Sequence, residues 1–276
     1  MAENKKDYSH FLLVSDIDGT LNNKLRRTPK INTAAVDEFV NSLKGNFTLA
    51  SARSVPSMRP HYMNLPGVKT PAIILNGAGI YSYSEEKMLW FNPIKESAVS
   101  IISRAMKKFP LLETGIFTTD MIYLVRPRIM SEIMMIIDRL PCKRYKTIEE
   151  VPKGNWGKVI FFCPAHQKKK IKNFISSILG DEHSFIDTSI MSFDLVDKNT
   201  NKGYAVNVLA GMLGIEKQNI AAIGDYYNDW DMLKTVAHPA CAGQAPNDIK
   251  SICEFVACHC NKGAVADLIS YIKKTY

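Results

Sequence analysis

Short, continuous apolar runs, each followed at once by polar residues, constrain the fold of this chain more than any other feature of its sequence. Four such runs lie at residues 11–14, 47–50, 72–75 and 220–223. A run of this kind is expected where a strand of a parallel sheet is buried on both faces. Between the first two runs, apolar residues recur at helical spacing from Val36 to Leu43. Strands that alternate with helices in this way predict a doubly wound α/β fold with a parallel sheet.

The middle of the chain follows a different pattern. It contains two longer helical patterns, residues 98–109 and 129–140, and strand-like runs at residues 121–125, 159–162 and 192–196. After it, a helical pattern that closes at Gly214 and the apolar run at 220–223 return to the style of the first segment. We therefore predict an α/β core made of residues 1–83 and 196–276, with an α+β domain inserted at residues 84–195.

Length and composition fit this division. With 276 residues, 46% of them apolar and 22% charged, the chain has the composition of a globular protein and room for two domains of roughly 100–200 residues. Its net charge of +8 is shared equally between residues 84–195 and the remainder. Nucleic-acid binding requires basic residues gathered on one face, with aromatic residues between them. The even distribution therefore favours small anionic substrates and no nucleic acid partner.

The N-terminus carries no recognisable targeting segment. Residues 1–10 are polar and charged, and the apolar run after them is shorter than the roughly 7–15 residues of a signal-peptide core. No apolar run approaches the ~18–20 residues of a membrane span. We expect a soluble, cytoplasmic protein with no membrane partner.

The six cysteines are irregularly spaced, and free thiols are the expectation for a cytoplasmic protein. The cluster Cys258-His259-Cys260 offers the ligand types of a zinc site. However, no second Cys or His pair stands at the spacing that would complete a tetrahedral site. We therefore expect no zinc there.

The segment Asp16-Ile17-Asp18-Gly19-Thr20, directly after the first apolar run, is the strongest candidate for chemistry. One carboxylate can attack an electrophilic phosphorus, and the other can protonate the departing oxygen and later deprotonate water. Two carboxylates would repel a phosphate, so a hard divalent ion such as Mg²⁺ is expected between them. The simpler interpretation is a solvated Asp-Gly turn.

A second polar segment, residues 224–229, follows the run at 220–223 and reads Gly-Asp-Tyr-Tyr-Asn-Asp. In open α/β sheets, ligands bind beyond the carboxyl ends of the strands. The two segments should therefore meet, and Asp225 is placed to complete a Mg²⁺ site. The alternative is a helix N-cap at Asn228 or Asp229, and that role is compatible with metal binding.

Two weaker candidates complete the set. Ser51, in Ser51-Ala52-Arg53, and the amides that follow it can donate hydrogen bonds to phosphate oxygens, although a Ser before a helix is commonly a cap. Lys202, before Gly203, can neutralise developing phosphoryl charge, although a lone Lys is usually a surface residue. The order of all four segments is what indicates a common site.

With these residues in this order, the sequence resembles the haloacid dehalogenase (HAD) superfamily, in particular its Cof-type branch of sugar-phosphate phosphatases. Residues 16–21 match the first motif of that family, Ser51 the second, Lys202 and Gly203 the third, and residues 224–229 the fourth. Two departures are visible. Ser51-Ala52-Arg53 stands where the branch commonly has Thr-Gly-Arg, and the pair Tyr226-Tyr227 is bulkier than usual, so Tyr227 is a candidate wall of the substrate pocket.

The resemblance implies a Mg²⁺-dependent phosphomonoesterase that acts on a small phosphorylated metabolite through an aspartyl-phosphate. Asp16 would be the nucleophile, Asp18 the general acid/base and Lys202 a further catalytic residue. Mg²⁺ would be held by Asp16, the backbone carbonyl of Asp18 and Asp225. Asn228 and Asp229 would support that site. Phosphate-binding residues would be Gly19, Thr20, Ser51, Ala52, Lys202 and Asn228, and substrate-binding residues Arg53, Asn76 and Gly77.

The inserted segment lies between the second and third motifs, as does the larger of the family's two cap types. The resemblance therefore implies a Rossmann-like core with a cap that contacts the leaving group. The candidates for this contact are Arg126, Arg128, Trp156 and His166, each of which is otherwise an ordinary surface or core residue.

Three alternatives remain open. A phosphomutase on the same scaffold would return the phosphoryl group to a sugar. A dehalogenase is less favoured, because displacing a halide needs neither a second Asp nor Mg²⁺. A non-catalytic phosphate-binding or signalling protein is the alternative from another class, but a receiver-like domain would be about 120 residues long and would carry no inserted domain.

Overall fold

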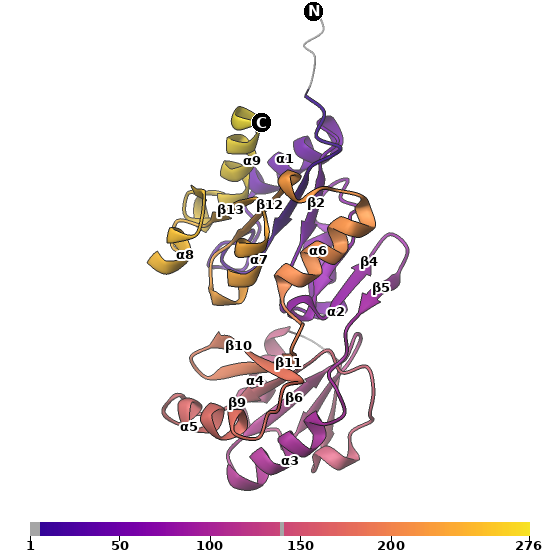
Figure 1. Ribbon diagram of the computed structural model, residues 1–276, viewed down its shortest axis with the longest axis vertical. Helices are drawn as coiled ribbons and strands as arrows, with labels where there is room; N and C mark the ends of the chain where they lie inside the picture. Colours follow the sequence, from indigo (N-terminus) through magenta and orange to yellow (C-terminus); the bar gives the residue numbers. More distant parts are fainter. Residues whose placement is uncertain (1–5, 139–140) are drawn as a thin grey trace, which may run out of the picture. The chain divides into compact units, whose positions relative to one another are not determined.

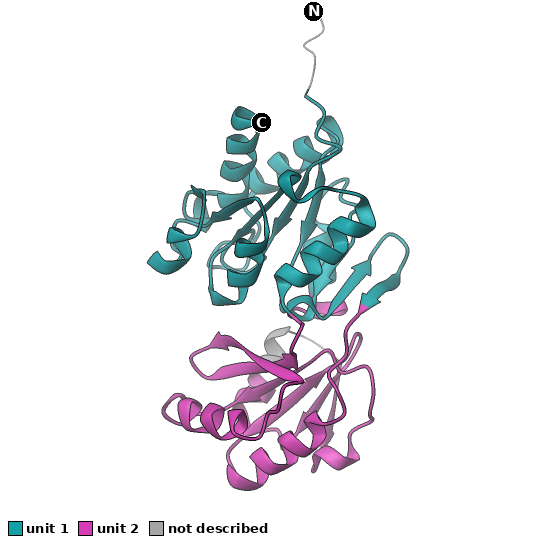
Figure 2. Cartoon of the chain, viewed as in Figure 1, with its two compact units in different colours: residues 1–52, 58–90, 201–276 teal, residues 53–57, 91–200 magenta. Residues whose placement is uncertain are grey.

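The computed structural model describes residues 6–138 and 141–276, and the chain divides into two compact units (Figures 1 and 2). Unit 1 comprises Met1–Ala52, Met58–Trp90 and Asn201–Tyr276. Unit 2 comprises Arg53–Ser57 and Phe91–Thr200. Each unit has its own sheet.

Unit 1 is built on a five-stranded parallel sheet in the order β14-β13-β12-β1-β2. The strands are β1 (Leu12–Ser15), β2 (Asn46–Leu49), β12 (Ile220–Gly224), β13 (His238–Cys241) and β14 (Phe255–Val256). Every residue of β1 and β12 is buried, as continuous apolar runs predict for central strands of a parallel sheet.

Helices cover both faces of this sheet. The helices of unit 1 are α1 (Lys30–Asp37), α2 (Val55–Met63), whose first residues belong to unit 2, α6 (Lys202–Leu213), α7 (Trp230–Thr235), α8 (Asn247–Ser251) and α9 (Ala264–Thr275). Leu12 and Val14 of β1 share a hydrophobic cluster with α6 and α7. Side chains alternate along a strand, so Leu13 points to the opposite face, where α1 and α9 pack together (Figure 1). The predicted doubly wound α/β core is confirmed.

The third predicted strand forms, but it does not extend the parallel sheet. β3 (Ala72–Ile74) pairs antiparallel with β4 (Gly79–Ser82), and β5 (Lys87–Phe91) completes a three-stranded sheet. A single parallel bridge, Ala50 to Ile73, connects β3 with the edge of the main sheet. The chain reverses after β3 because Leu75, Asn76 and Gly77 all have positive φ angles. This turn, rather than a crossover helix, decides the partner of β3.

Unit 2 has a six-stranded mixed sheet in the order β10-β11-β9-β6-β7-β8. Its strands are β6 (Glu113–Phe117), β7 (Ile122–Val125), β8 (Cys142–Tyr145), β9 (Lys158–Phe162), β10 (His183–Ser189) and β11 (Ser192–Asp197). Its helices are α3 (Ala98–Lys108), α4 (Ile129–Asp138) and α5 (Ala165–Ser176). The hydrophobic cluster of this unit contains only residues between Ile94 and Leu195. Unit 2 therefore has a core of its own.

The boundaries between the two units lie a few residues away from the boundaries predicted from the sequence. Unit 1 continues to Trp90, because β5 pairs with β4, whereas the sequence placed the change at residue 84. Unit 2 continues to Thr200, past the end of β11, whereas the sequence placed the return at residue 196. The short segment Arg53–Ser57 also groups with unit 2.

All six cysteines are free thiols. Within the described part of the chain, no helix combines the length and the apolar character that crossing a membrane requires.

Candidate active site

The predicted functional segments of unit 1 follow the carboxyl ends of neighbouring strands. Asp16 follows β1 directly, Ser51 lies two residues after β2, and Asp225 follows β12. β1 pairs in parallel with β2 on one side and with β12 on the other. The three strand ends therefore lie side by side at one edge of the sheet, which is where ligands bind in open α/β folds.

Asp16 and Asp229 are joined by one buried ammonium group. Nζ of Lys202 donates to Oδ1 of Asp16 and to Oδ1 of Asp229, at 2.6 Å in each case. The side chains of Lys202 and Asp229 are completely buried, and that of Asp16 is 6% exposed. Removing one member of a buried ion pair leaves an uncompensated charge, at a cost of about 3–5 kcal/mol. Lys202 is thus an integral part of the site and not the surface residue that its type alone suggests.

The start of α6 sets the position of Lys202. Asn201 caps this helix, and its side chain accepts a hydrogen bond from the Tyr204 amide at 2.7 Å. Gly77, with φ +96°, lies so close to the Asn201 carbonyl oxygen that a Cβ on this glycine would overlap it. The turn that ends β3 therefore holds the first turn of α6 in place.

Asp229 organises the loop that carries Asp225. Oδ2 of Asp229 accepts hydrogen bonds from the backbone amides of Asp225 at 2.9 Å and Tyr226 at 3.2 Å. Both of its oxygens are therefore used, one by Lys202 and the other by this loop. The predicted N-cap is not made as expected: Asp229 stands at the N-cap position of α7 but forms no side-chain cap hydrogen bond with that helix. Asp229 instead reaches back to Tyr226, at the start of the one-turn 3-10 helix Tyr227–Asp229.

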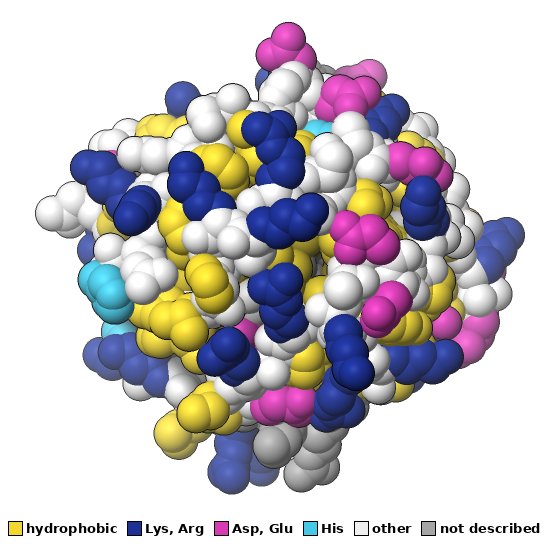
Figure 3. Space-filling model, turned by 90° about the horizontal axis from the view of Figure 1, so that it is seen from below, with side chains coloured by type: hydrophobic (Ala, Val, Ile, Leu, Met, Phe, Trp, Pro, Cys, Tyr) yellow, Lys and Arg dark blue, Asp and Glu magenta, His cyan; other side chains and the backbone are white. Residues whose placement is uncertain are grey.

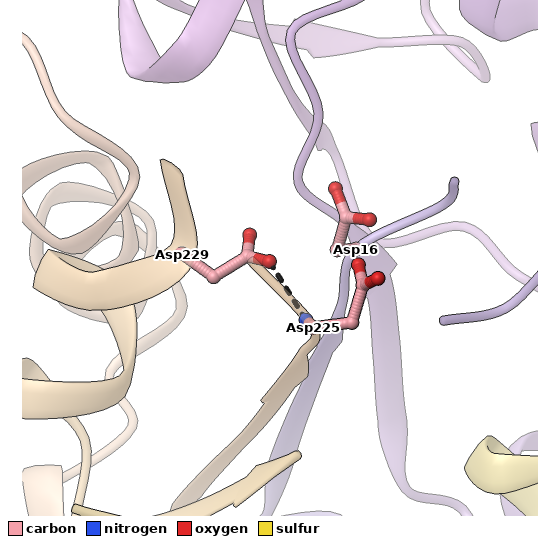
Figure 4. A group of neighbouring side chains, drawn as sticks. All are labelled: Asp16, Asp225 and Asp229. Atoms are coloured by element: carbon pink, nitrogen blue, oxygen red, sulfur yellow. Dashed lines mark hydrogen bonds between the residues drawn. The ribbon is translucent and has the colours of Figure 1, made fainter. Parts of the chain in front are cut away.

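Three carboxylates converge at this point. One oxygen from each of Asp16, Asp225 and Asp229 lies within 4.8 Å of the other two (Figure 4). Asp16 and Asp225 lie next to each other, while Asp229 approaches from the side of α7. Such a cluster of carboxylate oxygens fits a hard divalent cation such as Mg²⁺, which prefers oxygen ligands.

The electrostatics of the cluster favour a bound cation. Burial raises the pKa of Asp16 well above its ordinary value; Lys202 opposes this shift, and the charges of Asp229 and Asp225 add to it. Burial, followed by the charge of Asp229, raises the pKa of Asp225 from 3.8 to about 6. Both carboxylates therefore bind protons more readily than usual, and a divalent cation would compensate the same excess of negative charge.

Burial lowers the pKa of Lys202, but the charges of Asp16 and Asp229 outweigh this effect and raise the pKa above its ordinary value. The ammonium group is therefore protonated at neutral pH. It is a fixed positive charge against the carboxylate of Asp16.

The turn after β1 places the two carboxylates of the first motif in different environments. Asp16 is buried, whereas Asp18 is exposed. Between Asp18 and Thr20, Gly19 adopts φ +85°, and a Cβ at this position would overlap the carboxylate of Asp225. Glycine is therefore required both by the backbone conformation and by the close approach of Asp225. The Thr20 hydroxyl donates to Oδ1 of Asp225 at 3.3 Å, a contact that the sequence did not predict.

The other predicted residues are distributed as follows. Ser51 is buried at the end of β2, where its amide donates to the Ile73 carbonyl at 3.0 Å, and Ala52 next to it is half-buried. Asn76 is completely buried and Asn228 is half-buried. Arg53 belongs to unit 2, where its guanidinium donates to the Ser57 hydroxyl at 2.9 Å.

The leaving-group candidates all belong to unit 2. Trp156 is a core residue there, because its ring is buried and its indole N–H donates to the Pro152 carbonyl at 2.8 Å. The guanidinium of Arg126 donates to the Met106 carbonyl at 2.9 Å. Arg128 and His166 are exposed.

Sequence reasoning missed Gln244. Its side-chain amide donates to the Gly19 carbonyl oxygen at 2.5 Å and to Oδ2 of Asp225 at 3.4 Å. Gln244 follows β13, and this strand was not among those predicted. A polar residue after that strand end was the one signal that could have indicated it.

The family assignment rests on a family model that matches nearly the whole chain. The family model described as haloacid dehalogenase-like hydrolase matches residues 13–269. This chain belongs to that family. The resemblance inferred from the four motifs is therefore confirmed, and so is the prediction that the chain is an enzyme, a hydrolase of the HAD superfamily.

Known proteins resemble this HAD hydrolase over most of its length. A haloacid dehalogenase-like hydrolase from Bacteroides thetaiotaomicron matches with a TM-score of 0.85 and 18% identity, covering 95% of this chain and 99% of the other. The HAD subclass IIB sugar phosphatase BT4131 matches with a TM-score of 0.81 and 18% identity, covering 95% and 98%. A Mycoplasma pneumoniae protein, named as a candidate phosphatase, is 25% identical over 95% of this chain and 97% of its own length. The structural likenesses show a shared fold.

Proposed function

We propose that this HAD hydrolase is a Mg²⁺-dependent phosphomonoesterase that acts through an aspartyl-phosphate. The observation that carries the proposal is the environment of Asp16. This carboxylate lies at a strand end, bonded to the buried Lys202 and next to Asp225, with the exposed Asp18 two residues further on. A fixed nucleophile beside a second carboxyl that reaches solvent is what phosphoryl transfer in two steps requires.

Asp16 is the nucleophile in this mechanism. Nζ of Lys202 holds the carboxylate through Oδ1, and a carboxylate oxygen of Asp16 attacks phosphorus. The P–O bond to the leaving alcohol breaks as the new P–O bond forms, and Asp18 gives its proton to the departing oxygen. Asp18 then takes a proton from water, which attacks phosphorus and releases inorganic phosphate from Asp16.

Several residues stabilise the transferring group. Lys202 carries a positive charge next to the attacking carboxylate, because the charges of Asp16 and Asp229 raise its pKa above the ordinary value. Ser51, together with the backbone at Ala52, Gly19 and Thr20, is assigned to the phosphoryl oxygens.

Asp16, the backbone carbonyl of Asp18 and Asp225 would hold Mg²⁺, with Asp229 and Asn228 supporting the site. When bound, the ion neutralises negative charge shared by the phosphate and the carboxylates. Asp229 is well suited to support the metal site, because both of its oxygens already accept hydrogen bonds from Lys202 and from the loop amides.

We assign a small phosphorylated metabolite as the substrate, with sugar phosphates as the leading class. The structural neighbour BT4131 is described as a sugar phosphatase, and the proposal extends that class to this chain. On the face shown in Figure 3, lysine and arginine side chains are interspersed with acidic and apolar ones. Arg53, Asn76 and Gly77 are assigned to substrate binding. A phosphate-release screen over sugar, polyol, nucleotide and cofactor phosphates, with and without Mg²⁺, identifies the substrate.

The decisive variant is Asp16→Asn. An amide cannot attack phosphorus, so kcat is expected to fall by at least about 10³-fold while the fold is retained. Phosphate release and circular dichroism measure the two effects. Asp231→Asn, the same change at an exposed carboxylate of α7, is the control and is expected to keep full activity. An Asp16→Asn protein that still releases phosphate in a Mg²⁺-dependent way would contradict the mechanism.

The product separates this proposal from a phosphomutase on the same scaffold. Phosphatase turnover yields inorganic phosphate in amounts equal to the alcohol released. A phosphomutase would instead return the phosphoryl group to the sugar by way of a bisphosphorylated sugar and release an isomeric sugar monophosphate. Detection of that bisphosphate, rather than inorganic phosphate, would replace the phosphatase assignment.

A further inference from the structure

Gln244 connects three segments that are far apart in the sequence. Its Nε2 donates to the Gly19 carbonyl at 2.5 Å and to Oδ2 of Asp225 at 3.4 Å. Its Oε1 accepts a hydrogen bond from the backbone amide of Cys260 at 3.1 Å. The half-buried side chain of Gln244 therefore has partners at both ends of its amide.

These contacts fix the carboxylate of Asp225 from two directions. Oδ1 of Asp225 accepts from the Thr20 hydroxyl at 3.3 Å, and Oδ2 accepts from Gln244. Gln244 also bonds the carbonyl of Gly19, the residue whose positive φ brings the turn against Asp225. One side chain thus holds both the turn after β1 and the carboxylate after β12.

The bond from Cys260 orients Gln244 itself. An isolated Gln amide can rotate by 180° and exchange its donor and acceptor ends. The Cys260 amide is a donor only, so it selects the orientation in which Oε1 faces Cys260 and Nε2 faces Gly19 and Asp225. The backbone after β14 therefore determines which end of Gln244 faces the site.

We infer that Gln244 is a positioning residue for the divalent cation: it fixes the orientation of the Asp225 carboxylate and of the Gly19 turn. This inference rests on the proposed Mg²⁺-dependent function and adds to it a residue outside the four motifs. Groups that orient metal ligands contribute to affinity, and their loss typically weakens metal binding by about 10–100-fold. The cost arises because an unrestrained carboxylate and loop must be ordered when the ion binds.

The test compares Gln244→Met with Gln244→Ala in the full-length protein. Met keeps the length of the side chain but has neither the amide donor nor the carbonyl acceptor, so this variant preserves packing. Calorimetric titration of the substrate-free protein with Mg²⁺ gives the dissociation constant independently of turnover. We expect both variants to raise it by about 10–100-fold. At saturating Mg²⁺, kcat is expected to return to within about threefold of the wild-type value, because Gln244 does not contact the reacting atoms.

Gln218→Ala is the matched control. Gln218 is exposed, and its side-chain amide bonds Glu216 at 2.7 Å. The Mg²⁺ dissociation constant of this variant is expected to equal that of the wild type. Urea denaturation of all variants separates a loss of stability from a loss of affinity, since a purely structural role would move only the former.

Two outcomes overturn different claims. If the wild type binds Mg²⁺ and Gln244→Met binds it within twofold as tightly, the role of Gln244 is wrong and the proposed function stands. If the wild type binds no Mg²⁺ and turns over without it, the proposed function itself is wrong.

Discussion

Asp225 is a residue whose ionised side chain lowers the stability of the metal-free fold. Its pKa is raised to about 6, first by burial and then by the charge of Asp229. Because this folded-state pKa lies above the ordinary value of 3.8, the folded protein binds a proton at Asp225 more tightly than the unfolded chain does. The ionised carboxylate therefore destabilises the metal-free fold above pH 6, and this penalty vanishes as the pH falls below about 4.

We predict that metal-free Asp225→Asn is more stable than the wild type at pH 8, by up to about 2–3 kcal/mol. The difference should shrink steadily as the pH is lowered to 4.5. Urea denaturation in the presence of a chelator measures it at each pH. Adding Mg²⁺ should stabilise the wild type and leave the variant nearly unchanged. A stability difference that does not depend on pH would contradict this account, and exposed Asp231→Asn is the control.

At the scale of elements, the contact between the β3 turn and α6 bears directly on the position of Lys202. Gly77 abuts the Asn201 carbonyl and the first residue of α6, Lys202. Gly214 closes the same helix with φ +66°, but a Cβ there would meet no atom within 4 Å. Substitutions at the two glycines can therefore be compared. Gly214 reports the free-energy cost of a left-handed backbone alone, and Gly77 adds the cost of displacing α6.

Gly214→Ala is expected to cost about 1–2 kcal/mol of stability, from backbone strain alone, and to leave kcat unchanged. Gly77→Ala adds overlap with the backbone of α6 and is expected to cost about 2–5 kcal/mol. It should also lower kcat, because Lys202 moves with the helix. Thermal unfolding and phosphate release measure both effects. Equal losses in the two variants would show that the turn does not position α6.

The sequence predicted most elements whose pattern is local. The apolar runs at 11–14 and 220–223 became β1 and β12, and the helical pattern that closes at Gly214 became α6. The partner of β3 was not predicted, although the pair Asn76-Gly77 after it is typical of a hairpin turn. The reversal also needs a positive φ angle at Leu75, and a leucine rarely adopts that conformation. β13 was missed because His238 and Pro239 interrupt its apolar character.

At the scale of the whole molecule, the two units differ in how many segments of the chain build them. The hydrophobic cluster of unit 2 lies entirely between Ile94 and Leu195, whereas unit 1 is assembled from three segments. A buried ion pair, Lys158 to Asp194 at 2.8 Å, also joins two strands within unit 2. Among the described residues, every member of this hydrophobic cluster lies within the segment 91–200.

We therefore predict that a fragment of residues 91–200 folds on its own. Far-ultraviolet circular dichroism should show a mixed α/β spectrum, and heating should give one cooperative transition. Lys158→Met within the fragment should lower the stability by about 3–5 kcal/mol, because Asp194 loses its buried counter-charge. The fragment should release no phosphate, since Asp16, Lys202 and Asp225 are all in unit 1. A disordered spectrum would show that unit 2 depends on unit 1.

The sequence by itself determined the α/β core, and it indicated polar residues after three strands together with Lys202 before a helix. It could do so because burial on both faces of a strand and helical periodicity are written into consecutive residues. Only the tertiary structure decided that Lys202 is completely buried between Asp16 and Asp229, and that Gln244 joins Asp225 to the turn at Gly19. These partners are distant in the chain, and their meeting depends on how strands and helices pack. The sequence identified the chemical groups, and the packing of the core set their charges and orientations.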